Sequence, residues 1–261
     1  MLCTGVRRVP RLPDVMRKAF SRLVRDRYSV RDFLPDPIPD DVLEEILSDA
    51  RYSPSWSNTR PYCLAIASGA RRERLSAAYL RAFDASLGLQ HRKPWAVAQG
   101  LLLRRGWPDG DFRTWGRYPD GLRDRSVQVG ASLYRHLGIA RGDRPARDAQ
   151  ARQNCEFFGA PTVIWVFVHE GLLPFSAHDA GLMLQTLMLS AQAGGVGSCA
   201  LGVLATWRHP IDVEFEIPKH YKLVTGLALG YPSKAGVNDF RAEHPPIDLA
   251  TARVPVAPSA S

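Results

Sequence analysis

The sequence contains only four cysteines, and this scarcity excludes two classes of small fold. Cys3, Cys63, Cys155 and Cys199 lie far apart and form no CxxC pair, whereas disulfide frameworks and structural zinc sites need closely spaced cysteines. The histidines show no HExxH or HxH spacing, so we expect no metal centre. The wide cysteine spacing also favours a reducing compartment.

Long apolar runs are lacking as well. The most apolar window, Ala180–Ala193, is shorter than the ~20 residues that a membrane span needs, and it contains Gln185 and Gln192. The N-terminal stretch contains arginine and proline but no apolar core of a signal peptide. We therefore expect a soluble, cytoplasmic protein that has no membrane partner.

Lysine is rare: five lysines contribute to the 34 basic side chains, so the net charge of +8 rests almost entirely on arginine. The arginines are spread from Arg7 to Arg253 and form no single block, and no nucleic-acid-binding motif is present. Such a charge balance suits anionic small molecules. We expect a small-molecule partner and no nucleic acid.

The chain is long enough to bury a sizeable core, with 261 residues of which 45% are hydrophobic. No internal repeat or low-complexity linker divides it, so the pattern favours one α+β domain. Residues 1–12 are expected to form a flexible basic arm, and residues 13–261 form the domain. Within it, the scattered aromatic side chains of residues 88–125 predict a lid-like insertion. The proline-rich segment of about 232–261 predicts an extended tail.

Periodicity and capping signals place the main elements. Helices are expected from Pro13, from Pro39 and over 70–87, with further helices at about 124–138, 143–157 and 206–214. The run 161–168 is continuously β-branched and aromatic, which is typical of a strand buried on both faces. Other strands are expected at 62–68, 198–204 and 223–231. A helix capped by His178 and Asp179 and ending near 193 is apolar nearly all round, which predicts a central position.

The stretch Arg27-Tyr28-Ser29-Val30-Arg31 is the strongest candidate for a binding segment. If it is extended, Arg27, Ser29 and Arg31 lie on one side of the backbone. Two guanidinium groups and a hydroxyl on one side are good donors for a phosphate or for the polar edge of a heterocycle. The alternative is a solvated basic loop.

Three other segments place polar donors or tight backbone at element boundaries. The loop 50–62 contains SPSWSN and joins a helix to a strand; it is either a binding loop or an ordinary connection. The turn 194–197 follows a helix and lacks the GxGxxG spacing, so it does not predict a Rossmann site. Cys199, just after this turn, is interpreted as a buried small residue in preference to a nucleophile. The fourth segment is LALGYP with the NDFR stretch near Arg241.

In this order, the features resemble the FMN-dependent nitroreductase family from about Phe20 to Asp248. The resemblance begins with the RxSxR stretch and the Pro-Asp-Asp helix start and continues with the SPSWSNTRPY loop. It ends with the long apolar helix, the GGVGSCALG turn and the LALGYP strand with its NDFR segment. The middle of the chain is similar to a subgroup that includes nitroaromatic-acid reductases.

The resemblance implies an α+β fold with a central, mostly antiparallel sheet flanked by helices, in an intertwined homodimer with FMN in two interface pockets. It assigns FMN binding to ten residues: Arg27, Ser29, Arg31, Pro54, Ser55, Asn58, Ala200, Leu201, Gly202 and Arg241. The first three would hold the phosphate and the pyrimidine edge of the flavin, and the next three would come from the partner subunit. Backbone of the following three would lie near the reactive N5, and the last would clamp the phosphate.

The same resemblance implies that hydride passes from NAD(P)H through the flavin to an electron-poor acceptor such as a nitroaromatic or a quinone. No catalytic side chain is expected, because flavin chemistry needs mainly binding, orientation and electrostatics. Ene-reduction, reductive dehalogenation or oxidation on the same fold are alternatives, and so is a flavin- or anion-binding protein without activity.

Two positions depart from the family pattern. Arg60 stands where glutamine is usual, which leaves the dimer-facing edge of the flavin unassigned. His244 stands where a second arginine is frequent, which weakens the phosphate grip or adds a pH-sensitive contact.

Overall fold

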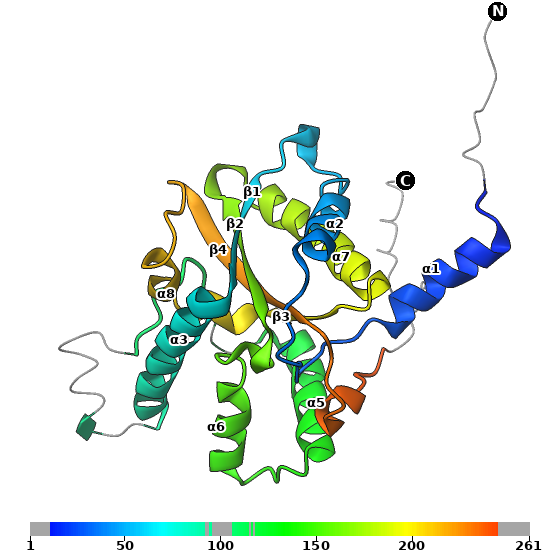
Figure 1. The fold of residues 1–261 in the computed structure, drawn as a ribbon. Helices are drawn as coiled ribbons and strands as arrows, with labels where there is room; N and C mark the ends of the chain where they lie inside the picture. The colour runs from blue at the N-terminus through cyan, green and yellow to red at the C-terminus, as the bar shows by residue number, and fades with distance from the viewer. Residues whose placement is uncertain (1–10, 92–93, 96–105, 115, 117, 245–261) are drawn as a thin grey trace, which may run out of the picture.

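A four-stranded antiparallel sheet forms the centre of the computed structural model, which describes residues 11–91, 94–95, 106–114, 116 and 118–244. The strand order is β1-β2-β4-β3, so β1 and β3 are the edge strands (Figure 1). The strands are β1 (Tyr62–Ser68), β2 (Thr162–His169), β3 (Gly197–Leu201) and β4 (Tyr221–Gly230). Within the described residues, the bounded α-helices are α1 (Asp14–Asp26), α2 (Asp40–Ala50), α3 (Gly69–Gln90), α5 (Asp120–His136), α6 (Arg144–Arg152), α7 (Phe175–Ala193) and α8 (His209–Asp212). The predicted α+β class with its antiparallel sheet is confirmed.

Strand β2 lies inside the sheet and separates two cores. Its side chains alternate between the faces, and all but the last are buried. Val163, Trp165 and Phe167 join the core under α3, and the alternate side chains join the core under α2 and α7. This explains the continuous apolar run, because a strand covered on both faces has no solvent side.

The core under α3 contains a closed polar network. The indole N–H of Trp165 donates to the Tyr79 hydroxyl at 3.1 Å, and that hydroxyl donates to the carbonyl of Leu204 at 3.0 Å. Both side chains are fully buried, so each polar atom has the partner that burial requires. The network ties α3 to the turn η4 (Gly202–Thr206), which follows β3.

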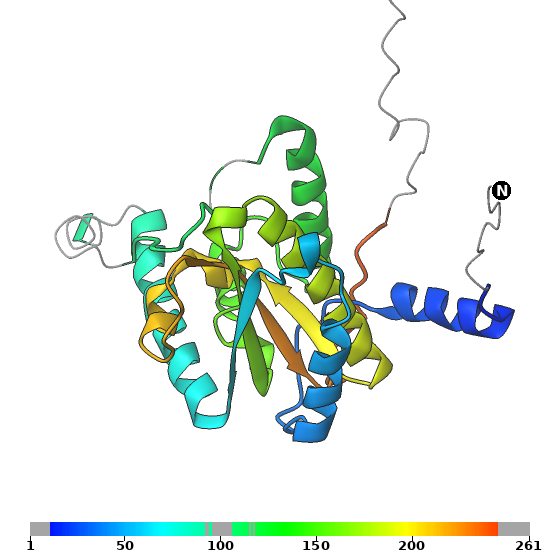
Figure 2. The same ribbon diagram turned by 90° about the horizontal axis from the view of Figure 1, so that it is seen from above.

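Two helices bury less apolar surface than their sequences predict. Helix α1 begins at Asp14, as expected, but no residue of it is buried, and Phe20 is 58% exposed. Figures 1 and 2 both show α1 extending away from the body of the molecule. Helix α7 buries one stripe against the sheet, whereas Leu182 and Gln185 on its outer side are exposed. The central position predicted for α7 therefore holds for the side that packs on the sheet, whereas the outer side is exposed in the single chain.

Helix boundaries differ from the sequence expectations at several places. α7 begins at Phe175, so His178 and Asp179 lie inside the helix and do not cap it; Pro174, immediately before the helix, was the better start signal. α5 begins at Asp120, inside the segment predicted to be a lid, because Pro119 precedes it. α6 ends at Arg152 and is followed by a short 3₁₀ turn.

The predicted terminal arm and tail lie mostly outside the described residues. Within the described part of the tail, the chain forms the 3₁₀ turn η5 (Gly236–Asp239). Among the described helices, none is long and apolar enough to cross a membrane.

Candidate functional site

Residues 27–33 run as an extended segment along the edge strand β3. Ser29 forms a parallel bridge with Ser198, and the N–H of Val30 donates to the Ser198 carbonyl at 3.0 Å. Val30 points inward and is only 1% exposed. A Cβ at Gly197 would lie 2.6 Å from the Val30 side chain, so glycine is needed there for the segment to approach the strand.

Arg27, Ser29 and Arg31 all lie close enough to Cys199 to influence the pKa of its thiol. Burial raises the pKa of the Cys199 thiol to about 11, although the two arginines pull it down. Cys199 is thus a buried, protonated residue, as expected, and unsuited to act as a nucleophile at neutral pH.

Asn238 is a residue of this region to which the sequence assigned no role. Its side-chain carbonyl accepts from the N–H of Arg31 at 2.8 Å, and its amide donates to the carbonyls of Asp32 at 2.7 Å and Ser233 at 3.1 Å. The side chain is buried. Asn238 therefore fixes the backbone of the arginine segment to the chain that follows β4.

Arg241 lies against the same segment. Its guanidinium carbon is 3.6 Å from the centre of the Tyr28 ring, and its Nη1 donates to the carbonyls of Asn238 at 2.7 Å and Phe240 at 3.0 Å. The Phe240 ring is also 5.8 Å from the guanidinium of Arg31. The structure thus gathers four predicted residues, 27, 29, 31 and 241, around the start of β3.

The end of β3 presents backbone to the surface. Ala200 and Gly202 are exposed, whereas Leu201 between them is buried. A Cβ at Gly202 would meet no atom within 4 Å. Of the three predicted residues at the end of β3, Ala200 and Gly202 are therefore open to the surface and Leu201 is not.

The SPSWSN loop is held by a buried carboxylate on α7. Asp179 is 2% exposed, and its Oδ2 accepts from the N–H of Trp56 at 2.9 Å. Ser53 donates to the hydroxyl of Thr186 at 2.8 Å, and the Trp56 ring lies 4.4 Å from that of Phe175. Asp179, expected only as a helix cap, is therefore the anchor of the loop.

Local backbone geometry sets the shape of the loop. Ser57, Asn58 and Arg60 all have positive φ angles, near 50°, which non-glycine residues seldom adopt. The hydroxyl of Ser55 accepts from the N–H of Arg60 at 3.0 Å and stabilises the turn. Pro54 and Ser55 line a shallow depression together with residues of α7. Burial raises the pKa of the neighbouring Tyr62, whose hydroxyl has no hydrogen-bond partner in the described part of the chain.

The loop and the arginine segment lie at opposite corners of the sheet. Through the pairings of β4 and β2, Ser198 stands in the same row as Ser68, the last residue of β1. The loop enters β1 at its first residue, Tyr62. Ser198 and Tyr62 are therefore three strand spacings apart across the sheet and six residues apart along a strand, which gives a distance on the order of 25 Å. Figure 1 shows the light-blue loop at the top of the view and the segment after α1 lower down, beside β3.

Within the predicted lid, residues 88–90 belong to α3, residues from Asp120 onward belong to α5, and residues 106–114 form a strap. Asp111 accepts from Arg208 at 2.6 Å and from the N–H of Leu223 at 2.8 Å. A Cβ at Gly110 would overlap the carbonyl of Ala205, so the strap lies directly on η4. Residues 96–105 lie outside the described residues, and the lid function stays a prediction. No cluster of metal-ligating side chains occurs among the residues that the structure describes.

The model of the nitroreductase family matches residues 24–231. Nitroreductase NfnB of Mycolicibacterium smegmatis is 31% identical over 89% of this chain and 93% of its own length. A 4-nitrobenzoate reductase of Pseudomonas putida is 32% identical over 85% of this chain and 89% of its own length.

Among solved structures, that of the FMN-dependent nitroreductase NfnB from Mycobacterium smegmatis, in complex with NADPH, superposes with a TM-score of 0.76. The two chains are 28% identical, and the match covers 93% of this chain and all of the other. Because the family model spans most of the sequence, the chain belongs to the nitroreductase family.

Proposed function

We propose that the protein is a homodimeric, FMN-dependent nitroreductase that passes hydride from NAD(P)H to a nitroaromatic acceptor. The observation that carries the proposal is the separation of two half-sites in one chain. One half-site consists of residues 27–31, 200–202 and 241, and the other is the SPSWSN loop. The two halves can meet only across an interface between two copies.

The first half-site fits FMN in its donor chemistry. Guanidinium groups and a hydroxyl suit a phosphate and the carbonyl-bearing edge of a flavin. No hydrogen bond of the Arg241 Nη2 is found among the described residues, so this group remains available to an anion. The exposed backbone at Ala200 and Gly202 offers a flat surface for a planar ring.

Bound FMN supplies the redox chemistry, since it accepts a hydride and passes it on. The chain contributes binding and electrostatics. Arg27 and Arg241 hold the phosphate, and Arg31 places positive charge beside the pyrimidine edge, where reduction adds negative charge. Pro54, Ser55 and Asn58 of the second copy close the pocket.

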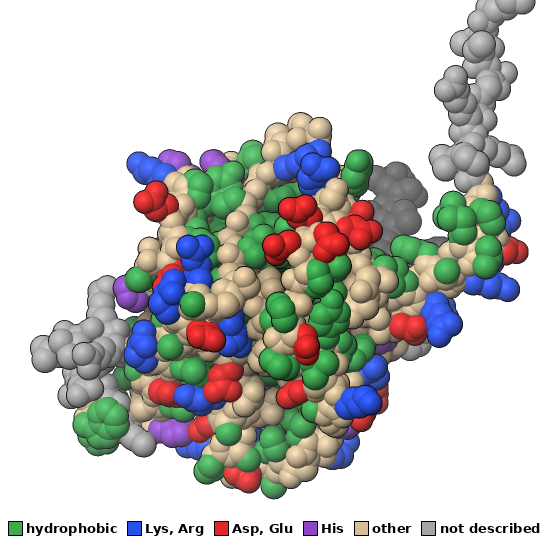
Figure 3. Space-filling view, in the orientation of Figure 1, with side chains coloured by type: hydrophobic (Ala, Val, Ile, Leu, Met, Phe, Trp, Pro, Cys, Tyr) green, Lys and Arg blue, Asp and Glu red, His purple; other side chains and the backbone are tan. Residues whose placement is uncertain are grey.

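Exposed apolar surface supports the homodimer. Helix α1 carries Val15, Met16 and Phe20, each more than half exposed, and Figure 3 shows hydrophobic side chains on α1 away from the body of the molecule. Trp56 and Phe175 are also exposed, at 60% and 47%. Patches of this kind are typical of interfaces, and a second copy with twofold symmetry would cover both at once.

The acceptor class follows from the relatives and from the charge of the site. Relatives are a 4-nitrobenzoate reductase and a chloronitrobenzene nitroreductase, the latter of Comamonas testosteroni. Cationic side chains around the pocket favour acceptors that carry a carboxylate. We therefore place nitrobenzoates ahead of neutral nitrobenzenes. The cytoplasmic location expected from the sequence stays a prediction.

A heterodimer of two defective subunits tests the shared pocket. Arg241→Ala removes one half-site and Asn58→Ala removes the other. With two affinity tags, the mixed dimer can be isolated by tandem purification. If each pocket takes Arg241 from one copy and Asn58 from the other, the mixed dimer has one intact pocket and one doubly defective pocket. Its FMN content and NADPH-dependent reduction of 4-nitrobenzoate should return to about half of the wild-type level.

The control is a doubly tagged dimer in which both copies carry Arg241→Ala, which should keep the low FMN content and low activity of that variant. If the pocket lay within one chain, both pockets of the mixed dimer would be singly defective and no activity would return. A stable monomer that retains FMN would also contradict the proposal.

A further inference from the structure

Helix α5 ends in a fixed turn that presents His136. Gly138 has a φ of 69°, and its N–H donates to the carbonyl of Arg135 at 3.1 Å. The N–H of Ile139 donates to the carbonyl of Tyr134 at 2.8 Å. These two bonds form the Schellman motif, in which glycine adopts the left-handed conformation. Because the helix end is held by its own backbone, His136, the last residue of α5, has a defined position.

His136 contacts the turn that carries Arg241. Its Nε2 lies 2.7 Å from the carbonyl oxygen of Gly236, and because a carbonyl oxygen only accepts, Nε2 is the donor. The His136 ring also lies 5.7 Å from the Phe240 ring, which is within the range of aromatic contacts. Figure 1 shows the turn η5 beside α5. His136 thus joins a helix from the middle of the chain to the turn that follows β4.

Phe240 connects His136 to Arg31. Its side chain is 7% exposed, and its ring centre is 5.8 Å from the guanidinium carbon of Arg31, within the reach of a cation–π interaction. Asn238 of the same turn binds the Arg31 backbone. The contacts therefore lead from α5 through the turn to the arginine segment.

We propose that His136 is a positioning residue for FMN. It acts through Phe240 on Arg31 and through Gly236 on the turn that carries Arg241. The inference rests on the proposed function, in which Arg241 holds the phosphate and Arg31 lies beside the pyrimidine edge. Reduction adds negative charge to this edge, so a displaced Arg31 weakens the binding of reduced FMN more than that of oxidised FMN.

The test measures both FMN affinity and the reduction potential of bound FMN in the dimeric protein. His136→Ala removes both contacts and should weaken the binding of oxidised FMN by about two- to fivefold, and that of reduced FMN by a further factor of about two to five. The further factor lowers the two-electron reduction potential by roughly 10–20 mV, measured by anaerobic titration against a reference dye. A helix end that only lost stability would not change the potential of FMN that is still bound.

Two variants separate the hydrogen bond from the ring contact. His136→Gln keeps an N–H donor for Gly236 but loses the ring, so it should restore the affinity for oxidised FMN and leave the potential low. His136→Phe keeps a ring beside Phe240 and should restore the potential. Arg135→Ala is the matched control in the same helical turn, because the Arg135 side chain has no hydrogen bond or ion pair within the described part of the chain.

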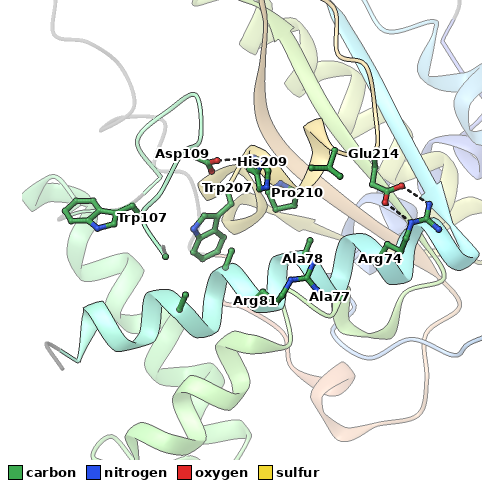
Figure 4. A pocket seen from close by; sticks show the side chains of 14 residues that line it. Arg74, Ala77, Ala78, Arg81, Trp107, Asp109, Trp207, His209, Pro210 and Glu214 are labelled. Atoms are coloured by element: carbon green, nitrogen blue, oxygen red, sulfur yellow. Dashed lines mark hydrogen bonds and ion pairs between the residues drawn. The ribbon is translucent and has the colours of Figure 1, made fainter. Parts of the chain in front are cut away.

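A distant control tests for a general effect of charge. Figure 4 shows Arg81 on α3, where it lines a cavity of about 940 Å³ between α3, Trp207 and α8. None of the residues that line this cavity belongs to the predicted flavin site. Arg81→Ala should therefore change neither FMN affinity nor the reduction potential.

The outcomes distinguish the role of His136 from the proposed function. Wild-type protein that binds FMN, together with unchanged affinity and potential in His136→Ala, would overturn the positioning role alone. An equal shift of the potential in Arg135→Ala would also overturn it. Wild-type protein that binds no FMN would refute the proposed function, and the role of His136 with it.

Discussion

Arg241 is held in place by the protein before any ligand binds. Its guanidinium rests on the Tyr28 ring at 3.6 Å, and its Nη1 is bound to two carbonyls of the same turn. Without this side chain, the ligand loses a hydrogen-bond donor that is already in position. The turn keeps its other hydrogen bonds, which are made by Asn238. Arg241→Ala should weaken FMN binding without unfolding the protein.

The expected size follows from the hydrogen bond between the guanidinium and the phosphate, which the alanine variant cannot make. A hydrogen bond to a charged partner contributes about 1.5–3 kcal/mol, which corresponds to a roughly 10- to 150-fold rise in the dissociation constant for FMN. The assay is titration of the apoprotein with FMN, followed by quenching of flavin fluorescence, at two salt concentrations. The affinity difference should shrink at high salt, because the interaction of Arg241 with the phosphate is electrostatic.

Two variants decide whether position and charge both matter. Arg241→Lys keeps the charge but loses the planar donor group and should fall between wild type and alanine. Tyr28→Leu keeps Arg241 but removes its support, and should weaken binding by a smaller factor. Arg81→Ala serves as the matched control far from the pocket. Unchanged FMN affinity in Arg241→Ala, with a dimer that persists, would show that the phosphate lies elsewhere.

Two further predictions concern the buried groups beside the half-sites. Asp179→Asn replaces the charged acceptor of the Trp56 N–H. It should lower the free energy of unfolding by about 1–2 kcal/mol, measured by urea titration, and should also weaken FMN binding, measured by FMN titration. No change in either quantity would refute the anchoring role of Asp179. The pKa of the Cys199 thiol is about 11 in the folded protein and about 8.5 in the unfolded chain. As pH rises, the unfolded chain loses this proton first, so the folded state loses stability relative to it between roughly pH 8.5 and pH 11. The free energy of unfolding should fall by about 1–2 kcal/mol between pH 8 and about pH 10 and should fall less in Cys199→Ala; equal slopes in urea titrations would contradict this.

The sequence pattern predicted those features of the fold that depend only on residues close together in the chain. The β-branched run of β2 predicted a strand buried on both faces, and the structure buries seven of its eight residues. Such a strand can be recognised from its own residues, because it has no polar side.

Features that depend on distant partners could not be predicted. Asn238 looks like an ordinary turn residue, yet it binds Arg31, 207 positions away in the sequence. Asp179 looks like a helix cap because it follows a histidine near a helix start, yet it binds Trp56 across 123 positions. The cavity at Trp207 joins α3, α8 and the strap, and no single segment carries a signal for it.

The same distinction explains the apolar surface of α7. Its sequence is apolar nearly all round, which predicted a central helix, and in one chain its outer side is exposed at residues such as Leu182 and Gln185. The apolar pattern of a helix indicates how much of its surface must be buried, but it does not indicate whether the same chain or a second copy buries it. The outer side of α7, the unburied α1 and the exposed Trp56 are all left open by the single chain, and Trp56 is bound to Asp179 of α7. One twofold contact could cover these surfaces and bring the loop of one copy toward the arginine segment of the other. If the homodimer forms in this way, the interface that completes the fold also completes the site.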